Sequence, residues 1–199
     1  MSLVIVDTGC ANLASVNYAF ERLGVSPFIS DDAAVIKAAE RVVLPGVGSA
    51  PYAMRNILAK NLKPVLTDLK QPVIGICLGM QLLFETLEEG GNQVEGLGLV
   101  KGGIAKLETG DLPTPHMGWN TLSIVKDDPV LANVQSGEFA YFVHSFAASL
   151  SEATLVKAEY GSPFSAIVRQ SNVWGCQFHP ERSSKTGAQI LKNFLDIEL

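Results

Sequence analysis

Four short apolar runs in the first half of the chain alternate with segments of helical spacing. The apolar runs are residues 3–6, 26–30, 41–44 and 73–76. The segments with apolar residues at helical spacing are residues 12–23, 33–39, about 51–58 and about 64–69. A short, continuous apolar run is typical of a strand that is buried on both faces. Because strands that alternate with helices pair in parallel, we expect an α/β fold with an open, mostly parallel sheet flanked by helices.

The second half has a different pattern, in which short β-rich runs are separated by turn-like pieces. The runs are residues 97–100, 104–107, 121–125, 139–143, 154–160, 164–169 and 173–178. The turn-like pieces include "DLPTPHMGWN" at 111–120 and "KDDPV" at 126–130. Strands separated by such turns predict an antiparallel extension of the sheet, followed by a last helix at about 187–195.

Length and composition narrow the class of protein. With 199 residues, 47% of them hydrophobic, the chain suits one domain over 1–199. Its net charge of -5 disfavours nucleic-acid binding, and no apolar stretch approaches the ~20 residues of a membrane span. The start "MSLVIVDTG" lacks the basic region of a signal peptide and predicts a first strand. Three cysteines without CxxC spacing argue against a zinc site or a disulfide framework, so we expect a reducing, cytoplasmic location.

Cys77 lies in the hexapeptide "GICLGM", residues 75–80, between the fourth apolar run and a helix expected at 78–87. Ligands bind open parallel sheets at the carboxyl ends of the strands, and the flanking glycines allow a sharp turn there. Such a turn presents a nucleophile, and the N–H of the next residue, Leu78, can serve as a donor to an oxyanion. Most cysteines are buried structural residues, and Cys10 and Cys176 are interpreted in that way.

His179 is the candidate base for Cys77. A cysteine reacts as its thiolate, which needs a base or a cation nearby. His179 follows the run 173–178 at another expected strand end, and Glu181 lies two residues further on, where its carboxylate can orient the imidazole. Cys77, His179 and Glu181 therefore form a candidate nucleophile–base–orienter set. The other histidines, His116 and His144, are interpreted as surface or hydrogen-bonded core residues.

A second glycine turn, "LPGVGSA" at 44–50, also follows an expected strand. The backbone N–H groups of Gly46, Val47 and Gly48 are candidate donors to an oxyanion at the same edge of the sheet. The segment lacks the lysine of a P-loop, so phosphate binding is disfavoured. Glycine-rich strands can rotate their peptides at small cost, and a rotated peptide would withhold its donor from the oxyanion.

Three motifs together resemble the class I, or triad-type, glutamine amidotransferases: "GICLGMQ", "LPGVGS" and "QFHPE". Within that class, "PHMGWN" at 115–120, "YFVHSF" at 141–146 and "DTGCANL" at 7–13 are similar to the glutaminase subunits of imidazole glycerol phosphate synthases. The resemblance covers about residues 3–196 and implies the flavodoxin-like sheet of the class. One departure is Met80, where other members of the class commonly carry histidine.

The resemblance implies that the chain hydrolyses L-glutamine to glutamate and ammonia through a thioester on Cys77, with no metal or cofactor. His179 would give the proton to the leaving ammonia, and Glu181 would orient His179. The residues that match the glutamine-binding positions of the family are Gln81, Glu89, Ser145 and Phe146. Gln81 lies four residues after Cys77, one helical turn along the same face, so its side chain can reach the same crevice.

The resemblance also implies a separate partner, a cyclase subunit with a (β/α)8 barrel that receives the ammonia in histidine biosynthesis. The residues that match the partner face are Asn12, Met117, Trp119 and Asn120. Met and Trp are enriched at interfaces, whereas packing of Trp119 into the chain's own core is the alternative. The second substrate of the family binds the partner, so no nucleotide site is assigned here. The glutaminase of the family is nearly idle until the partner is loaded, and a "PGVG" peptide that points its N–H away from the crevice is our hypothesis for this latency.

Three other functions are compatible with parts of the sequence. The chain could serve an amidotransferase of the anthranilate or aminodeoxychorismate type, and the partner with which it copurifies would decide. A stand-alone cysteine hydrolase would need no partner, and "PHMGWN" argues against it. A catalytically inactive binding subunit is the third alternative, and intact Cys77, His179 and Glu181 argue against that.

Overall fold

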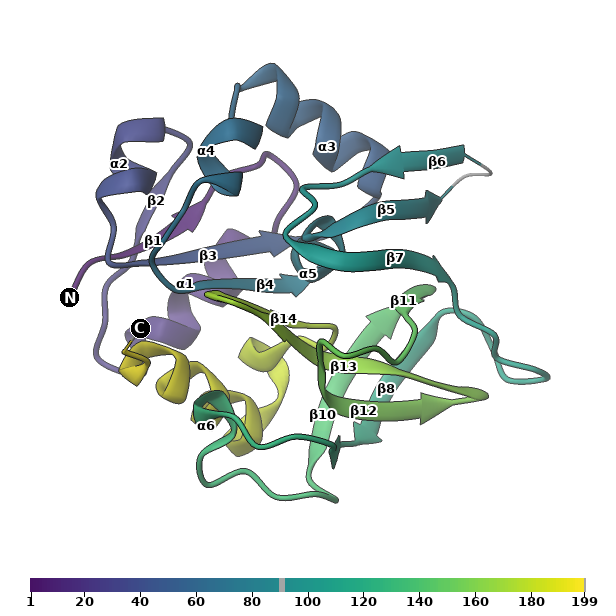
Figure 1. Cartoon of the computed structure of the whole chain (residues 1–199). Coiled ribbons are helices and arrows are strands. Elements are labelled where there is room, and N and C mark those ends of the chain that lie inside the picture. Colours follow the sequence, from purple (N-terminus) through teal and green to yellow (C-terminus); the bar gives the residue numbers. More distant parts are fainter. Residues whose placement is uncertain (90–91, 199) are drawn as a thin grey trace.

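The computed structural model describes residues 1–89 and 92–198, with an eight-stranded sheet at its centre (Figure 1). The strand order is β2-β1-β3-β4-β14-β13-β12-β9. The strands are β1 (Leu3–Val6), β2 (Phe28–Ser30), β3 (Arg41–Gly46), β4 (Val73–Cys77), β9 (Ser123–Ile124), β12 (Thr154–Tyr160), β13 (Ser162–Gln170) and β14 (Val173–Cys176). From β2 to β14 the neighbours pair in parallel, and β13, β12 and β9 continue the sheet antiparallel. The predicted α/β fold with an antiparallel extension is confirmed.

Helices cover both faces of this sheet (Figure 1). They are α1 (Leu13–Glu21), α2 (Ala33–Ala38), α3 (Ala50–Ala59), α4 (Lys63–Thr67), α5 (Leu78–Leu82) and α6 (Ser184–Asp196). Leu3 and Ile5 of β1 pack into one core with Phe20 of α1. Val4 and Val6 pack into the core of the opposite face. Because β1 is buried on both faces, its run is apolar throughout. Among the helices of the described residues, none has the length and apolar character to cross a membrane.

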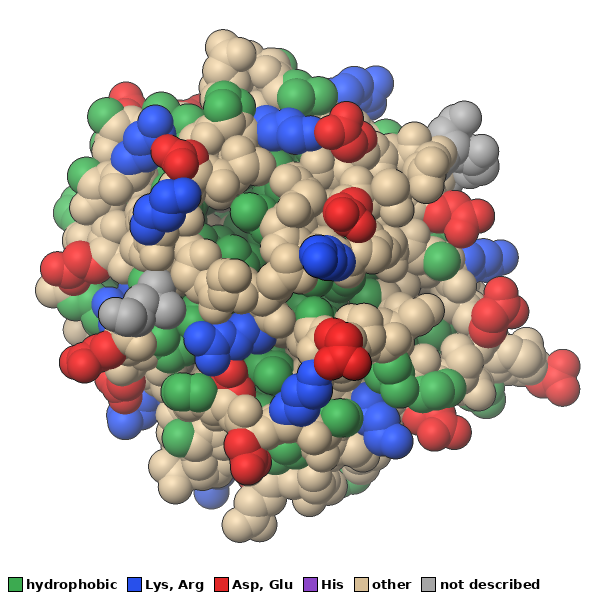
Figure 2. All heavy atoms as spheres, in the orientation of Figure 1, with side chains coloured by type: hydrophobic (Ala, Val, Ile, Leu, Met, Phe, Trp, Pro, Cys, Tyr) green, Lys and Arg blue, Asp and Glu red, His purple; other side chains and the backbone are tan. Residues whose placement is uncertain are grey.

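Two smaller sheets lie beside the central one (Figure 1). One has the order β11-β7-β5-β6 and the other pairs β10 with β8. Their strands are β5 (Phe84–Glu89), β6 (Asn92–Glu95), β7 (Val100–Lys106), β8 (His116–Thr121), β10 (Phe139–His144) and β11 (Phe146–Ala148), and the chain also has the short 3-10 helices η1 (Pro129–Leu131) and η2 (Pro180–Arg182). Acidic and basic side chains are interspersed over the face in Figure 2, so the described residues form no continuous basic surface there.

The helix expected at 78–87 is wrong beyond Leu82. Helix α5 ends there, and the chain turns into strand β5. The carbonyl oxygen of Leu82 accepts a hydrogen bond from the N–H of Leu97 at 2.8 Å, and that of Leu83 accepts one from Val100 at 2.9 Å. N–H groups from a later part of the chain thus bond to the carbonyls that would accept intrahelical hydrogen bonds if α5 were longer. Local spacing does not contain this information.

One further expectation in the second half is incomplete and another is wrong. The run 173–178 is expected in the antiparallel extension, and β14 does pair antiparallel with β13, but on its other side it pairs in parallel with β4, with Val173 opposite Val73 and Cys176 opposite Ile76. The carboxyl ends of β4 and β14 therefore lie at the same edge of the sheet. The segment "PHMGWN" is expected to be turn-like, but residues 116–121 form strand β8, which pairs antiparallel with β10. In both cases the partner strand, rather than the local sequence, determines the structure.

Candidate active site

Cys77 occupies a strained turn at the carboxyl end of β4. Its backbone angles are φ 53° and ψ -114°, which side-chain-bearing residues rarely adopt. Such a conformation costs about 1–3 kcal/mol and persists only where the surrounding structure imposes it. Here α5 begins at the next residue, Leu78, and β4 lies between β3 and β14 in the sheet. The predicted strand–nucleophile–helix turn is present.

Glycines make this turn possible because α5 packs directly against the backbone of β3 and β4. A Cβ on Gly79 would lie 1.8 Å from the carbonyl oxygen of Leu44. A Cβ on Gly75 would lie 2.7 Å from Cα of Met80. Neither position leaves room for a side chain, so the close approach of helix and strands requires glycine.

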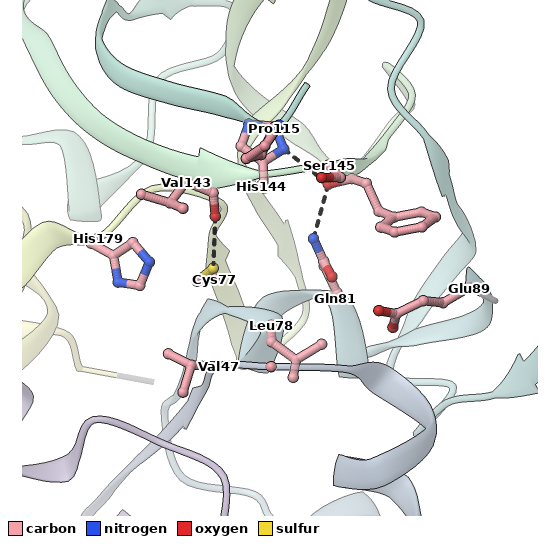
Figure 3. A pocket seen from close by; sticks show the side chains of 12 residues that line it. Val47, Cys77, Leu78, Gln81, Glu89, Pro115, Val143, His144, Ser145 and His179 are labelled. Atoms are coloured by element: carbon pink, nitrogen blue, oxygen red, sulfur yellow. Dashed lines mark hydrogen bonds between the residues drawn. The ribbon is translucent and has the colours of Figure 1, made fainter. Parts of the chain in front are cut away.

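His179 comes from the end of β14 and faces the same pocket as Cys77 (Figure 3). Two bonds to neighbouring elements hold its backbone. Its N–H donates to the carbonyl of Tyr141 in β10 at 2.9 Å, and its own carbonyl accepts from the hydroxyl of Ser183 at 2.7 Å. The parallel pairing of β14 with β4 places the imidazole and the thiol at one edge of the sheet.

Glu181, in η2, lies behind His179. Its Oε1 accepts a hydrogen bond from His179 Nδ1 at 2.8 Å, and the carboxylate side chain is only 3% exposed. Burial alone would lower the pKa of His179, but hydrogen bonds and charges from Cys77 and Glu181 outweigh burial and raise the pKa to about 10. Both neighbours therefore favour the charged, imidazolium form of His179.

A pocket of about 290 Å³ lies over Cys77, a size suited to a small molecule. Nine of the residues predicted for the site line it: Cys77, His179, Val47, Gly48, Leu78, Gln81, Glu89, Ser145 and Phe146. Gly46 lies outside the lining, opposite Cys77 in the pairing of β3 with β4. The lining residues that sequence reasoning missed are Pro115, Val143 and His144.

The wall of the pocket formed by β10 lies close to the thiol. The thiol of Cys77 donates a weak hydrogen bond to the carbonyl oxygen of Val143, with 3.7 Å between sulfur and oxygen (Figure 3). Val143 and His144 belong to "YFVHSF", and Val143 lies 66 residues from Cys77 in the chain. That motif identified the segment as distinctive, but its spacing could not place it against the nucleophile.

The N–H of Val47 is turned away from the pocket in this structure. It donates to the carbonyl of Cys10 at 2.8 Å. The next residue, Gly48, has φ 90°, and a Cβ built there would meet nothing within 4 Å. Val47 therefore lines the pocket without directing its backbone donor into it.

Gln81 is held by hydrogen bonds from both sides. Its Nε2 donates to the carbonyl of Phe146 at 2.9 Å (Figure 3). The same nitrogen donates to Oε1 of Gln177, also at 2.9 Å. Because these bonds use both N–H groups of the amide, its carbonyl oxygen is left to accept from another group. Glu89 lines another part of the pocket, and its Oε2 accepts from the N–H of Ala50, the first residue of α3, at 2.5 Å.

The residues expected at the partner face lie on an exposed part of the surface. Met117 is 62% exposed and Trp119 is 53% exposed, so the alternative that Trp119 packs into its own core is wrong. The Trp119 ring packs edge-on against Tyr141, with 5.9 Å between ring centres. Asn120 lies on the same strand, β8, and Asn12 caps α1, where its side chain accepts from the N–H of Ser15.

Comparison with known proteins identifies the family of this chain. Residues 4–197 match the family Glutamine amidotransferase class-I, and the chain belongs to that family. The chain is 52% identical to the imidazole glycerol phosphate synthase subunit HisH of Idiomarina loihiensis, over 100% of both chains. It is 50% identical to the subunit of the same name from Colwellia psychrerythraea, over 98% of this chain and 92% of that protein.

Solved structures with lower sequence identity share the fold. A putative GMP synthase subunit from Thermoplasma acidophilum superposes with a TM-score of 0.74 at 18% identity, over 98% of this chain and 92% of that chain. PurLQS from Thermotoga maritima superposes with a TM-score of 0.73 at 22% identity, over 98% of this chain and 97% of that chain.

Proposed function

We propose that this chain is the glutaminase subunit of an imidazole glycerol phosphate synthase, acting as one amidotransferase domain. It hydrolyses L-glutamine and supplies the ammonia for histidine biosynthesis. The observation that carries the proposal is the meeting of Cys77, His179 and Glu181 beside one small pocket. The identity of about half the residues with HisH subunits, over the full chain, supports this choice within the family.

The reaction begins from a Cys77 thiolate whose proton has passed to His179, and the thiolate attacks the side-chain amide carbon of glutamine. The carbonyl oxygen becomes an oxyanion, and collapse of this intermediate breaks the C–N bond. The imidazolium of His179 gives its proton to the departing nitrogen, which leaves as ammonia, and a γ-glutamyl thioester remains. His179 then takes a proton from water, whose oxygen attacks the thioester, and glutamate leaves as the sulfur returns. Throughout, Glu181 orients the ring and stabilises its charged form.

The far part of the pocket suits the α-amino and α-carboxylate groups of the substrate. The free carbonyl oxygen of Gln81 and the carboxylate of Glu89 are acceptors that match an ammonium group. The backbone at Ser145 and Phe146 lines the same pocket, next to Gln81. These groups would hold the substrate so that its amide carbon lies over Cys77.

The oxyanion requires donors that the resting structure supplies only in part. The N–H of Leu78, at the start of α5, is one candidate, whereas that of Val47 is bonded to Cys10. Removing one donor to an oxyanion costs about 3–4 kcal/mol of transition-state stabilisation. Rotation of the "PGVG" peptide toward the pocket would supply the missing donor, and this accounts for a glutaminase that stays slow until its partner is loaded.

The partner in this proposal is a cyclase subunit with a (β/α)8 barrel. Free ammonia would be protonated and lost in water, so glutaminase and cyclase must form an interface that keeps the ammonia from the solvent. Exposed Met117 and Trp119, with Asn12 and Asn120, supply an interface of suitable chemistry. The free thiol of Cys77 must also stay reduced, which supports a cytoplasmic location.

Mixing the chain with the cyclase tests the proposal. We expect glutamine hydrolysis to rise strongly when the cyclase and its nucleotide ligand are both present. Cys77→Ala should abolish glutamine-dependent turnover but leave the cyclase active with added ammonia. Cys10→Ala is the matched control, because it removes a thiol while keeping the carbonyl that binds Val47. Loss of the ammonia-dependent reaction in Cys77→Ala would contradict this division of roles, and full activity of the isolated chain would contradict the proposed latency.

A further inference from the structure

Two buried histidines join the surface of β8 to the glutamine pocket. His116 is 3% exposed and His144 is 6% exposed. His116 Nδ1 lies 2.9 Å from His144 Nε2, and His144 Nδ1 lies 2.9 Å from the carbonyl oxygen of Phe146. At the other end, Nδ2 of Asn120 lies 3.3 Å from His116 Nε2. The proposed reaction uses neither ring, although each belongs to one of the two most distinctive motifs.

Only one arrangement of protons satisfies this chain of bonds when both rings are neutral. The carbonyl of Phe146 can only accept, so His144 Nδ1 carries the hydrogen and His144 Nε2 accepts. His116 Nδ1 must then donate, and His116 Nε2 accepts from Asn120. Burial lowers the pKa of both histidines to about 4, which keeps both rings neutral near pH 7.

The rings cannot easily leave this arrangement because aromatic side chains pack around them. His116 stacks between Tyr160 and Phe142, with ring centres 4.1 and 5.0 Å away. His144 meets the edge of Phe164 at 4.9 Å. A ring packed in this way keeps its two nitrogens directed at fixed partners.

At the pocket end, the bonds converge on one carbonyl group. The oxygen of Phe146 accepts from both His144 and Gln81, which uses both of its lone pairs. The position of Gln81 therefore depends on the orientation of that peptide. Because Gln81 is one of the groups proposed to bind the substrate, the histidines act on binding through it.

At the surface end, Asn120 is the donor that sets the direction of the whole chain of bonds. Its Nδ2 also donates to the carbonyl of Glu159 at 2.8 Å, and its Oδ1 accepts from the N–H of Thr121. Its neighbours on β8 are the exposed Met117 and Trp119 of the proposed partner face. A contact that turns this amide would remove the donor from His116.

We propose that His116 and His144 are positioning residues that hold Gln81 through the Phe146 carbonyl and make glutamine binding sensitive to contact at Asn120. This inference rests on the proposed function, since it assigns Gln81 to the substrate. Its expected signature is an altered KM for glutamine with little change in kcat. A residue that only stabilised the fold would not separate the two constants in this way.

The test compares two substitutions of His144 in the complex with saturating cyclase. His144→Phe keeps a ring but removes both hydrogen bonds, and we expect KM for glutamine to rise about tenfold, the effect of losing about one buried hydrogen bond. His144→Asn keeps a donor near the place of Nδ1, so it should restore KM to within about threefold of the wild type. Alkylation of Cys77 by iodoacetamide, which does not use Gln81, should proceed at the wild-type rate in both variants.

Two further variants keep the test decisive if His144→Phe does not fold. His116→Phe preserves the stacking but breaks the chain of bonds one step earlier, and Asn120→Asp replaces the donor by an acceptor. Both should raise KM in the same direction. Unchanged KM in all folded variants, or equal effects of His144→Phe and His144→Asn, would overturn the inference. An inactive wild-type complex would instead refute the proposed function itself, so the two failures are distinguishable.

Discussion

Replacing Glu181 by glutamine tests how the buried carboxylate supports the base. The carboxylate accepts from His179 Nδ1 at 2.8 Å and is almost fully buried. Glutamine keeps the shape and one acceptor oxygen but removes the negative charge. We therefore expect the imidazolium to be less stable and to be present in a smaller fraction of the enzyme.

The magnitude follows from the kind of hydrogen bond that is lost. A hydrogen bond to a charged group contributes about 1.5–3 kcal/mol, whereas a neutral one contributes about 0.5–1.5 kcal/mol. The difference of about 1–2 kcal/mol corresponds to a decrease in kcat of about 5- to 30-fold. KM for glutamine should stay close to the wild-type value, because Glu181 lies behind His179 and outside the pocket lining.

The assay is steady-state glutamine hydrolysis in the complex with loaded cyclase, with thermal melting as a check of folding. Glu89→Gln is the matched control, because it removes a carboxylate from the pocket wall and should raise KM more than it lowers kcat. A Glu181→Gln enzyme with wild-type kcat would refute the assignment of Glu181 as the group that supports His179. A raised KM with unchanged kcat would refute it equally.

Three further predictions concern stability and partner binding. Gly79→Ala should lower the free energy of unfolding by about 3 kcal/mol or more in urea titration, because its Cβ would overlap the carbonyl of Leu44. A free energy of unfolding equal to that of the wild type would contradict the packing of α5. Because the folded pKa of His144 is lowered to about 4 from 6.5, its contribution to stability is present above pH 6.5 and is lost toward pH 4, with a slope of up to about 1.4 kcal/mol per pH unit. When urea titrations are repeated across this pH range, the stability of His144→Phe should change less steeply with pH. An unchanged slope would argue against His144 as the origin of the pH dependence. Trp119→Ala should weaken cyclase binding about 30-fold by calorimetry, whereas Phe28→Ala, also exposed but on β2, should not; equal effects would argue against the proposed face.

The parts of the fold that depend on burial could be predicted from the sequence. A strand covered on both faces must be apolar throughout, so β1 and β4 could be located from their apolar runs. The turn at Cys77 could be located in a similar way, because glycines on both sides of a cysteine at a strand end are typical of a sharp turn. Each of these features is recorded within about ten consecutive residues.

The features that could not be predicted depend on distant partners. Whether residues 84–89 form helix or strand depends on β7, with Phe84 opposite Val100. The direction of β14 depends on how a long intervening segment returns to β4. The hydrogen bond between His116 and His144 joins rings 28 residues apart in the chain, on strands whose pairing neither motif encodes locally.

The place of β14 in the sheet has a consequence for biosynthesis of the enzyme. Among the strands of the described residues, β14 comes last in the sequence, yet it is inserted between β4 and β13, in the interior of the sheet. A nascent chain that ends shortly after Cys77 lacks His179, the base in the proposed reaction. Under the proposed function, glutamine hydrolysis therefore has to wait until β14 is in the sheet, and a partial translation product consumes no glutamine.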